Sequence, residues 1–149
     1  MSHPANPAVL DAVEALSIAR PFTPDAVARS LGVALTPRPE LSNAHFAVHV
    51  GRGDGASPFA EVELRQPIAP GADGLVLVKL AGSLAIHKPE VMDRFGVRPE
   101  LEVPTPRQPP SAPIYFVYRF GWGDARFGFD REGGEALRVV VLDATEARP

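Results

Sequence analysis

The chain has 149 residues, a net charge of −3 and an apolar fraction of 45%, which fits one globular domain that buries its own core. It contains no cysteine, which excludes disulfides and thiolate metal sites. Its charges are mixed, without the basic tract that favours nucleic-acid binding, and no run approaches the roughly 18 apolar residues of a membrane span.

The first residues contain neither the basic region nor the apolar region of a signal peptide. We therefore expect a cytoplasmic protein, or a periplasmic one if a leader is missing from this sequence. The first predicted element is a helix over residues 7–20. Asn6 and Pro7 form a start signal, apolar residues then recur at helical spacing, and Pro21 follows as a stop.

The rest of the chain contains one pattern twice, over units 23–82 and 87–143. Each unit opens with a proline-initiated helix, and the glycines that end these helices, Gly32 and Gly96, lie 64 positions apart. A proline-bearing stretch follows each helix, the longer one spanning residues 99–113. Three strand-like runs come next, over 46–50, 61–65 and 75–78 in the first unit and over 116–120, 126–130 and 137–141 in the second.

Alternation along these runs predicts which side chains face the core. In the first unit we expect Phe46, Val48 and Val50 to share the buried face with Val62 and Leu64, and His49, Glu61 and Glu63 to point outward. In the second unit the expected buried face comprises Phe116, Tyr118, Phe120, Phe127, Phe129, Leu137, Val139 and Val141, with Phe116 matched to Phe46. Short turns imply antiparallel neighbours. The predicted fold is α+β: one domain, 1–149, of tandem helix-plus-three-strand repeats, whose antiparallel sheet has the helices packed on one face.

The sequence shows no convincing catalytic constellation. His45 and His49 lie on a predicted strand, about 13 Å apart, too far to share a metal easily. Glu61 and Glu63 resemble a glycosidase pair in spacing, but two carboxylates on one strand are more typical of a solvated face. We therefore predict a protein that is not an enzyme and holds no cofactor and no metal.

Aromatic and arginine side chains point instead to a protein interface. Tyr115, Arg119 and Arg126 are predicted to face outward, and Trp122 lies in the adjoining glycine-flanked turn. These residue types dominate interface hot spots. Trp122 is either an interface anchor or a cover over the edge of the core. The predicted partner-binding residues are Tyr115, Arg119, Trp122 and Arg126, with Glu61 and Glu63 as acidic contacts.

The order of helix, proline-bearing connection, aromatic-rich strand and two further strands resembles one repeat of the β-lactamase inhibitory protein family. It is also similar to the outer-membrane-assembly lipoproteins of the SmpA/OmlA type. The tandem arrangement over about residues 23–142 is closer to the former. The chain differs in lacking the disulfides of the inhibitory proteins and the lipid-anchor cysteine of the lipoproteins. The resemblance implies a curved sheet whose open face grips another protein.

Bacterial immunity proteins are similar in size and in their absence of catalytic residues. The sequence therefore predicts a non-enzymatic bacterial protein that binds a toxin or an enzyme and occludes it, as an inhibitor or immunity protein. No nucleic acid and no membrane is expected as a partner. Two alternatives stay open: a small ligand-binding domain or enzyme with a site between the two units, and an assembly or scaffold module.

Overall fold

A computed structural model describes residues 5–109, 111–131 and 135–145. Its elements are α1 (Ala5–Ile18), α2 (Pro24–Leu31), β1 (Thr36–Pro37), the 3-10 turn η1 (Pro39–Leu41), β2 (Phe46–Arg52), β3 (Phe59–Pro67), β4 (Leu75–Leu80), α3 (Lys88–Phe95), β5 (Glu100–Glu102), β6 (Ile114–Phe120), β7 (Gly123–Phe129) and β8 (Leu137–Asp143).

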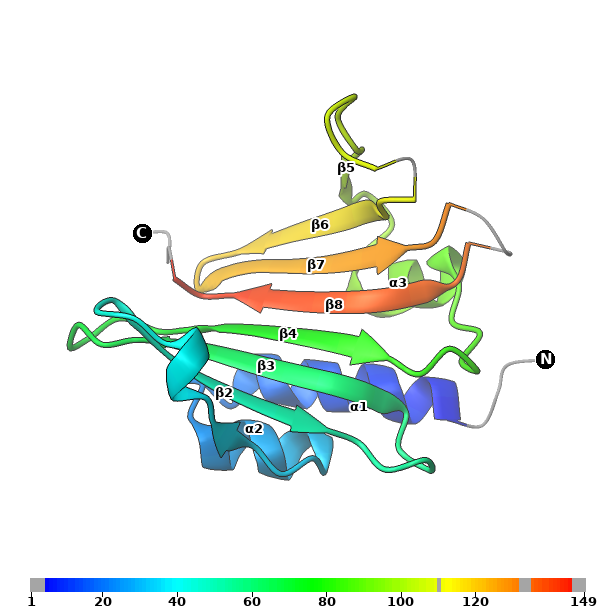
Figure 1. Cartoon of the computed structure of the whole chain (residues 1–149). Coiled ribbons are helices and arrows are strands. Elements are labelled where there is room, and N and C mark those ends of the chain that lie inside the picture. Colours follow the sequence, from blue (N-terminus) through cyan, green and yellow to red (C-terminus); the bar gives the residue numbers. More distant parts are fainter. Residues whose placement is uncertain (1–4, 110, 132–134, 146–149) are drawn as a thin grey trace.

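The strands form one antiparallel sheet in the order β1-β2-β3-β4-β8-β7-β6-β5 (Figure 1). The last strand of each predicted unit, β4 and β8, lies at the centre, and the second half of the sheet repeats the order of the first half in reverse. The α+β class and the antiparallel sheet are confirmed.

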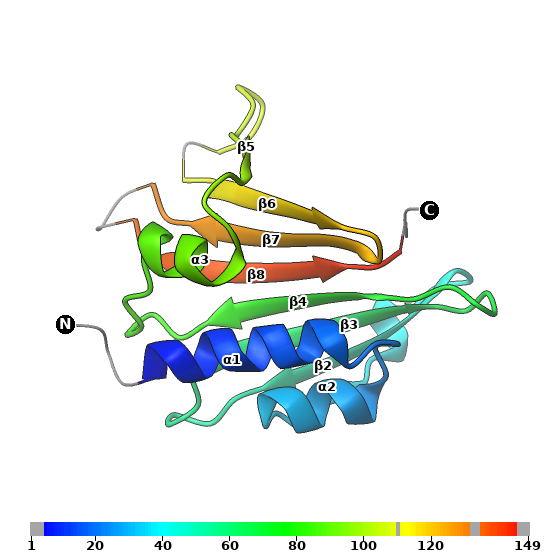
Figure 2. The same ribbon diagram turned by 180° about the vertical axis from the view of Figure 1, so that it is seen from behind.

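The three helices lie in front of the sheet in Figure 2, so one face carries helices and the other carries none except the short turn η1 (Figure 1). The core fills the space between the helices and the sheet. Its largest fully buried side chains include Phe22, Leu64, Ile86, Phe127 and Phe129. We call the helix-free surface of the sheet the open face.

Local signals set the helix ends. The Thr23 hydroxyl accepts a hydrogen bond from the Ala26 N–H at the start of α2, and Gly32 ends this helix at a φ of 67°, where a side chain would be strained. At the start of α3 the Glu90 carboxylate accepts from the His87 N–H. Helix α1 begins and ends two residues earlier than the predicted range 7–20.

The proline-bearing stretches contain strands that the sequence did not indicate. β1 and β5 are the two outermost strands of the sheet, which is where proline is tolerated because one side of the backbone needs no partner. Each half therefore consists of a helix and four strands, rather than the predicted helix and three strands.

The predicted orientation of β2 is wrong. Val48 pairs with Arg65, and Val50 with Glu63, so the side chains of Phe46, Val48 and Val50 lie on the face opposite Val62 and Leu64. The helix side of β2 carries Ala47, His49 and Gly51. A Cβ at Gly51 would collide with the Ala34 carbonyl, because the backbone after α2 passes over the strand there. Phe46 and Phe116 consequently lie on opposite faces.

The predicted orientation of β8 is also wrong at its centre. Val140 pairs with Phe127 on one side and Val78 on the other, and it is fully buried in the core. Val139 and Val141 therefore face away from the helices. Leu137 is buried as predicted, because the register shifts between Gly128 and Phe129. Consecutive valines do not alternate in polarity, so the sequence leaves the orientation of this strand undetermined.

Candidate functional site

The open face brings five of the six predicted partner-binding residues together. Cross-strand partners share a face of a sheet, and one continuous row of partners crosses the open face. The row runs through Val50, Glu63, Leu77, Val141, Arg126, Val117 and Glu100. Glu61 lies two residues from Glu63 on the same face, and Tyr115 and Arg119 lie two residues on either side of Val117.

The centre of the open face is apolar. Leu75 and Leu77 on β4, and Val139 and Val141 on β8, are half-buried although no helix covers them, and Leu77 is the direct partner of Val141. Sequence reasoning missed these four residues. The signal for them is that 75–78 and 139–142 are continuous apolar runs, which is typical of strands covered on both faces.

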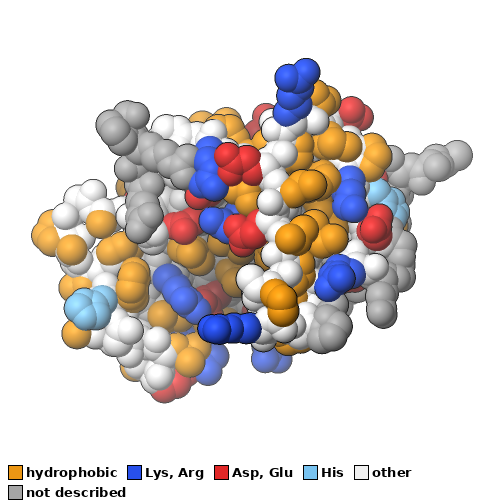
Figure 3. Space-filling view, turned by 90° about the horizontal axis from the view of Figure 1, so that it is seen from above, with side chains coloured by type: hydrophobic (Ala, Val, Ile, Leu, Met, Phe, Trp, Pro, Cys, Tyr) orange, Lys and Arg blue, Asp and Glu red, His pale blue; other side chains and the backbone are white. Residues whose placement is uncertain are grey.

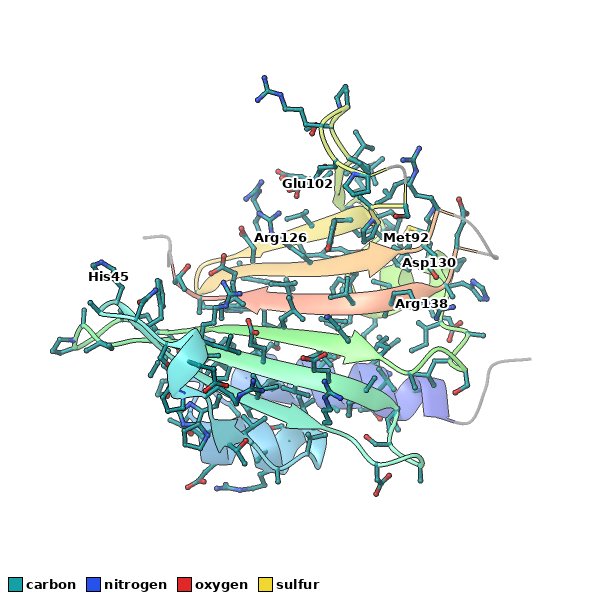
Figure 4. All side chains as sticks on the ribbon, in the orientation of Figure 1. His45, Met92, Glu102, Arg126, Asp130 and Arg138 are labelled. Atoms are coloured by element: carbon teal, nitrogen blue, oxygen red, sulfur yellow. The ribbon has the colours of Figure 1, made fainter. Side chains whose placement is uncertain are left out.

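Ion pairs form one border of this apolar centre, on β5, β6 and β7. The Arg119 Nε lies 2.6 Å from the Glu100 Oε2, and the Arg126 Nη1 lies 2.5 Å from the Glu102 Oε2 (Figure 4). Both guanidinium groups also approach the Asp124 Oδ2, at 3.3 and 3.7 Å. The hydrogen bond to Glu100 raises the pKa of Arg119. These side chains therefore form one linked network of opposite charges.

The opposite border lies on β3 and β4 and has the same chemistry. The Arg65 Nε lies 2.7 Å from the Glu63 Oε2, and the Lys79 Nζ lies 3.7 Å from the Glu61 Oε2. Both carboxylates are half-buried, in ion pairs rather than in a cleft. Their environment is that of a charged rim rather than of an acid/base pair.

The ring of Tyr115 lies next to Gly128, beside the apolar centre. A Cβ at Gly128 would lie 2.9 Å from Tyr115 Cε1 and 2.5 Å from Val139 Cγ1, so the glycine leaves room for the aromatic ring. Burial raises the pKa of the Tyr115 phenol, and the Glu102 carboxylate adds to that rise. Tyr115 thus offers an aromatic surface with a neutral hydroxyl.

Trp122 does not lie on this face. Its ring stacks on Phe120 at 5.4 Å between centroids, meets Phe22 edge-on at 6.3 Å, and receives the Arg20 guanidinium at 5.1 Å. It packs against the helix-side core, which is the second of the two readings that the sequence left open. Glycines flanking a tryptophan do not reveal the direction of its side chain.

The two candidate histidines, His45 and His49, differ in exposure. His45 is exposed in the turn before β2, and His49 is half-buried on the helix side. Within 5–109, 111–131 and 135–145, no group of three or more His, Asp or Glu side chains is arranged to hold a metal ion.

A groove of about 350 Å³ runs between α1 and α3, and it includes Glu14, Glu90 and Arg94. Arg94 is bound to Asp11 at 2.5 Å and to Glu14 at 3.5 Å.

No protein-family model matches the chain, and no curated protein or solved structure matches it significantly. Among the described residues, none of the helices combines the length and the apolar character that crossing a membrane requires.

Proposed function

We propose that the chain is a non-enzymatic protein that binds another protein through its open face. The observation that carries this proposal is the composition of that face: an apolar centre around Leu77 and Val141, bordered on both sides by ion pairs. An apolar centre with a polar rim is the usual anatomy of a protein interface.

The free energy expected from covering the apolar centre supports this assignment. Complete burial of one aliphatic side chain contributes about 1.5–3 kcal/mol relative to full exposure. No more than about a third of each of the four central side chains remains exposed, so covering them contributes at most about 2–4 kcal/mol in total. The ion pairs of the rim add little affinity by themselves, but they set the orientation of the partner and exclude partners with a mismatched charge pattern.

The two halves of the chain are best explained as structural repeats. Leu77 and Val141 are separated by the same 64 positions as Gly32 and Gly96, and they pair with each other at the centre of the sheet. Neighbouring residues at this offset have matched burial: Val76 and Val140 are each 0% exposed, and Val78 and Leu142 are each 1% exposed. The junction of the two repeats then forms the middle of the binding face.

The role that fits such a surface is occlusion. A broad sheet face pressed over a toxin or an enzyme blocks its working surface sterically, as the likeness to inhibitory and immunity proteins implies. A ligand site between the two sheet halves is less favoured, because β4 and β8 are paired directly over five residue pairs.

The test starts by capturing the partner from the native host and purifying it. Titration calorimetry then compares the wild type with Val141→Arg, which places a charge in the apolar centre. We expect a loss of about 2 kcal/mol or more, or some thirtyfold in affinity. Arg119→Ala and Arg126→Ala test the charged rim.

Ile18→Arg is the matched control, because Ile18 is an exposed apolar residue at the end of α1, on the helix side. A partner that binds Val141→Arg as tightly as the wild type, or that loses affinity only with Ile18→Arg, would remove the open face from consideration.

A further inference from the structure

The sheet ends in a strand that has an unoccupied edge. β5 (Glu100–Glu102) pairs with β6 and is the last strand in the sheet order. In the described part of the chain, no strand lies along its outer side. Outer edges offer backbone hydrogen-bonding groups to other chains. Pro99 and Pro104 flank β5 and limit this edge to a few residues, which prevents open-ended association.

The side chains of β5 give its two faces different chemistry. Glu100 and Glu102 lie on the open face, where they bind Arg119 and Arg126, yet their side chains remain 60% and 52% exposed. Leu101 pairs with Phe116, so it lies on the helix side, and it is 65% exposed. The edge thus presents carboxylates on one face and an aliphatic side chain on the other.

Exposed apolar side chains gather around this strand. Val97 is 73% exposed and Val103 is 62% exposed, and both lie within four residues of Leu101. Figure 3, which looks toward the β5 end of the sheet, shows a band of hydrophobic side chains beside groups of acidic and basic ones. Exposed aliphatic groups concentrated next to a free backbone edge are unusual for a surface that meets only water.

We propose that β5 accepts one further strand from another protein: an extended segment in which basic side chains alternate with apolar ones. Basic side chains of that strand would meet Glu100 and Glu102 on the open face. Its apolar side chains would cover Leu101 on the helix side. Backbone hydrogen bonds supply affinity in this mode of recognition, and the alternating side chains supply specificity.

Charge selects this occupant over a second copy of the chain. Antiparallel pairing of two β5 strands centred on Leu101 would place Glu100 of each copy directly opposite Glu102 of the other. Like charges at directly opposed positions destabilise a pair of strands. The other outer strand, β1, is a poorer acceptor, because it has only two residues and one of them is Pro37, which has no N–H to donate.

The probe is a capped eight-residue peptide that alternates lysine with valine, compared with a peptide of the same composition in which four lysines precede four valines. Amide chemical shifts of the isotopically labelled full chain are followed during titration. We expect saturable changes centred on residues 100–103 and on the β6 residues 115–117, with the alternating peptide only.

The double variant Glu100→Gln with Glu102→Gln should weaken binding about tenfold, since two charged contacts of the size usual between strands are lost. Glu40→Gln is the matched control, because it neutralises an exposed carboxylate on η1, which is paired with Arg38. Leu101→Lys should also weaken binding. Because Leu101 lies on the helix side, this variant separates binding at β5 from binding to the open face.

Equal shifts with both peptides, or shifts that lie away from residues 100–103, would overturn the proposal. A dimer in sedimentation of the wild type that Leu101→Lys abolishes would also overturn it, since the occupant would then be a second copy.

Discussion

Two neighbouring valines in β8 provide a direct test of the fold. Val140 is fully buried between Val78 and Phe127, on the helix side. Val141 is half-buried on the open face, opposite Leu77 and Arg126. The substitution of valine by threonine keeps the shape and the β-branch but adds a hydroxyl. Val140→Thr and Val141→Thr are therefore the same chemical change on opposite faces of one strand.

The expected losses of unfolding free energy differ between the two positions. At position 140 the hydroxyl enters an apolar environment, which costs about 1–3 kcal/mol of unfolding free energy when the group finds no partner. At position 141 it reaches the open face and water, so the change should stay within about 0.5 kcal/mol. Urea denaturation, followed by circular dichroism and by Trp122 fluorescence, measures both values. Equal costs, or a larger cost for Val141→Thr, would show that the orientation of β8 is reversed.

Three further predictions test the core and its titratable groups. Phe127→Ala should cost about 3–5 kcal/mol in urea denaturation, because its buried ring contacts the ring of Phe95; a cost below about 1 kcal/mol would contradict this. Trp122→Ala should cost about 1–3 kcal/mol in thermal melts, without affecting peptide binding at β5. The pKa values of Tyr115 and Tyr118 are both raised by burial, so their absorbance should titrate above pH 10. Stability from these neutral phenols is complete below about pH 10 and is lost as the pH rises through the folded-state values.

Much of the fold could be predicted from local signals. The Thr23-Pro24 start and the Gly32 end of α2 depend on residues that are adjacent in sequence, and α2 begins and ends there. Helix α3 likewise ends at Phe95, directly before Gly96, as the sequence predicts. The antiparallel arrangement follows from short turns. Pro37 lies in β1, and Pro99 and Pro104 flank β5, which are the two outermost strands, where proline is tolerated. Each of these predictions needs only the chain geometry of a few consecutive residues.

Which face of a strand points toward the core could not be predicted from such local signals. In β2, valines alternate with Ala47, His49 and Gly51, and hydrophobicity alone places the valines inside. The backbone near Ala34, which lies far along the chain, decides otherwise by leaving room only for small residues at Gly51. Register is likewise a property of two paired strands and cannot be read from one of them. The sequence therefore predicts Val139 and Val141 in the core, whereas the structure buries Val140 there.

The misassigned residues of β8 and the proposed binding face have one physical cause. In a strand with one solvent-exposed face, apolar and polar residues alternate, and this alternation shows which face points toward the core. β4 and β8 do not alternate, because both of their faces carry aliphatic side chains, and only one face is covered by helices. The ambiguity at Leu77 and Val141 therefore carries information: apolar side chains on a helix-free face, held between Glu63–Arg65 and Arg126–Glu102, are the observation on which the proposed binding face rests. The variants Val140→Thr and Val141→Arg separate these two roles, since the first should lower stability and the second should lower partner affinity.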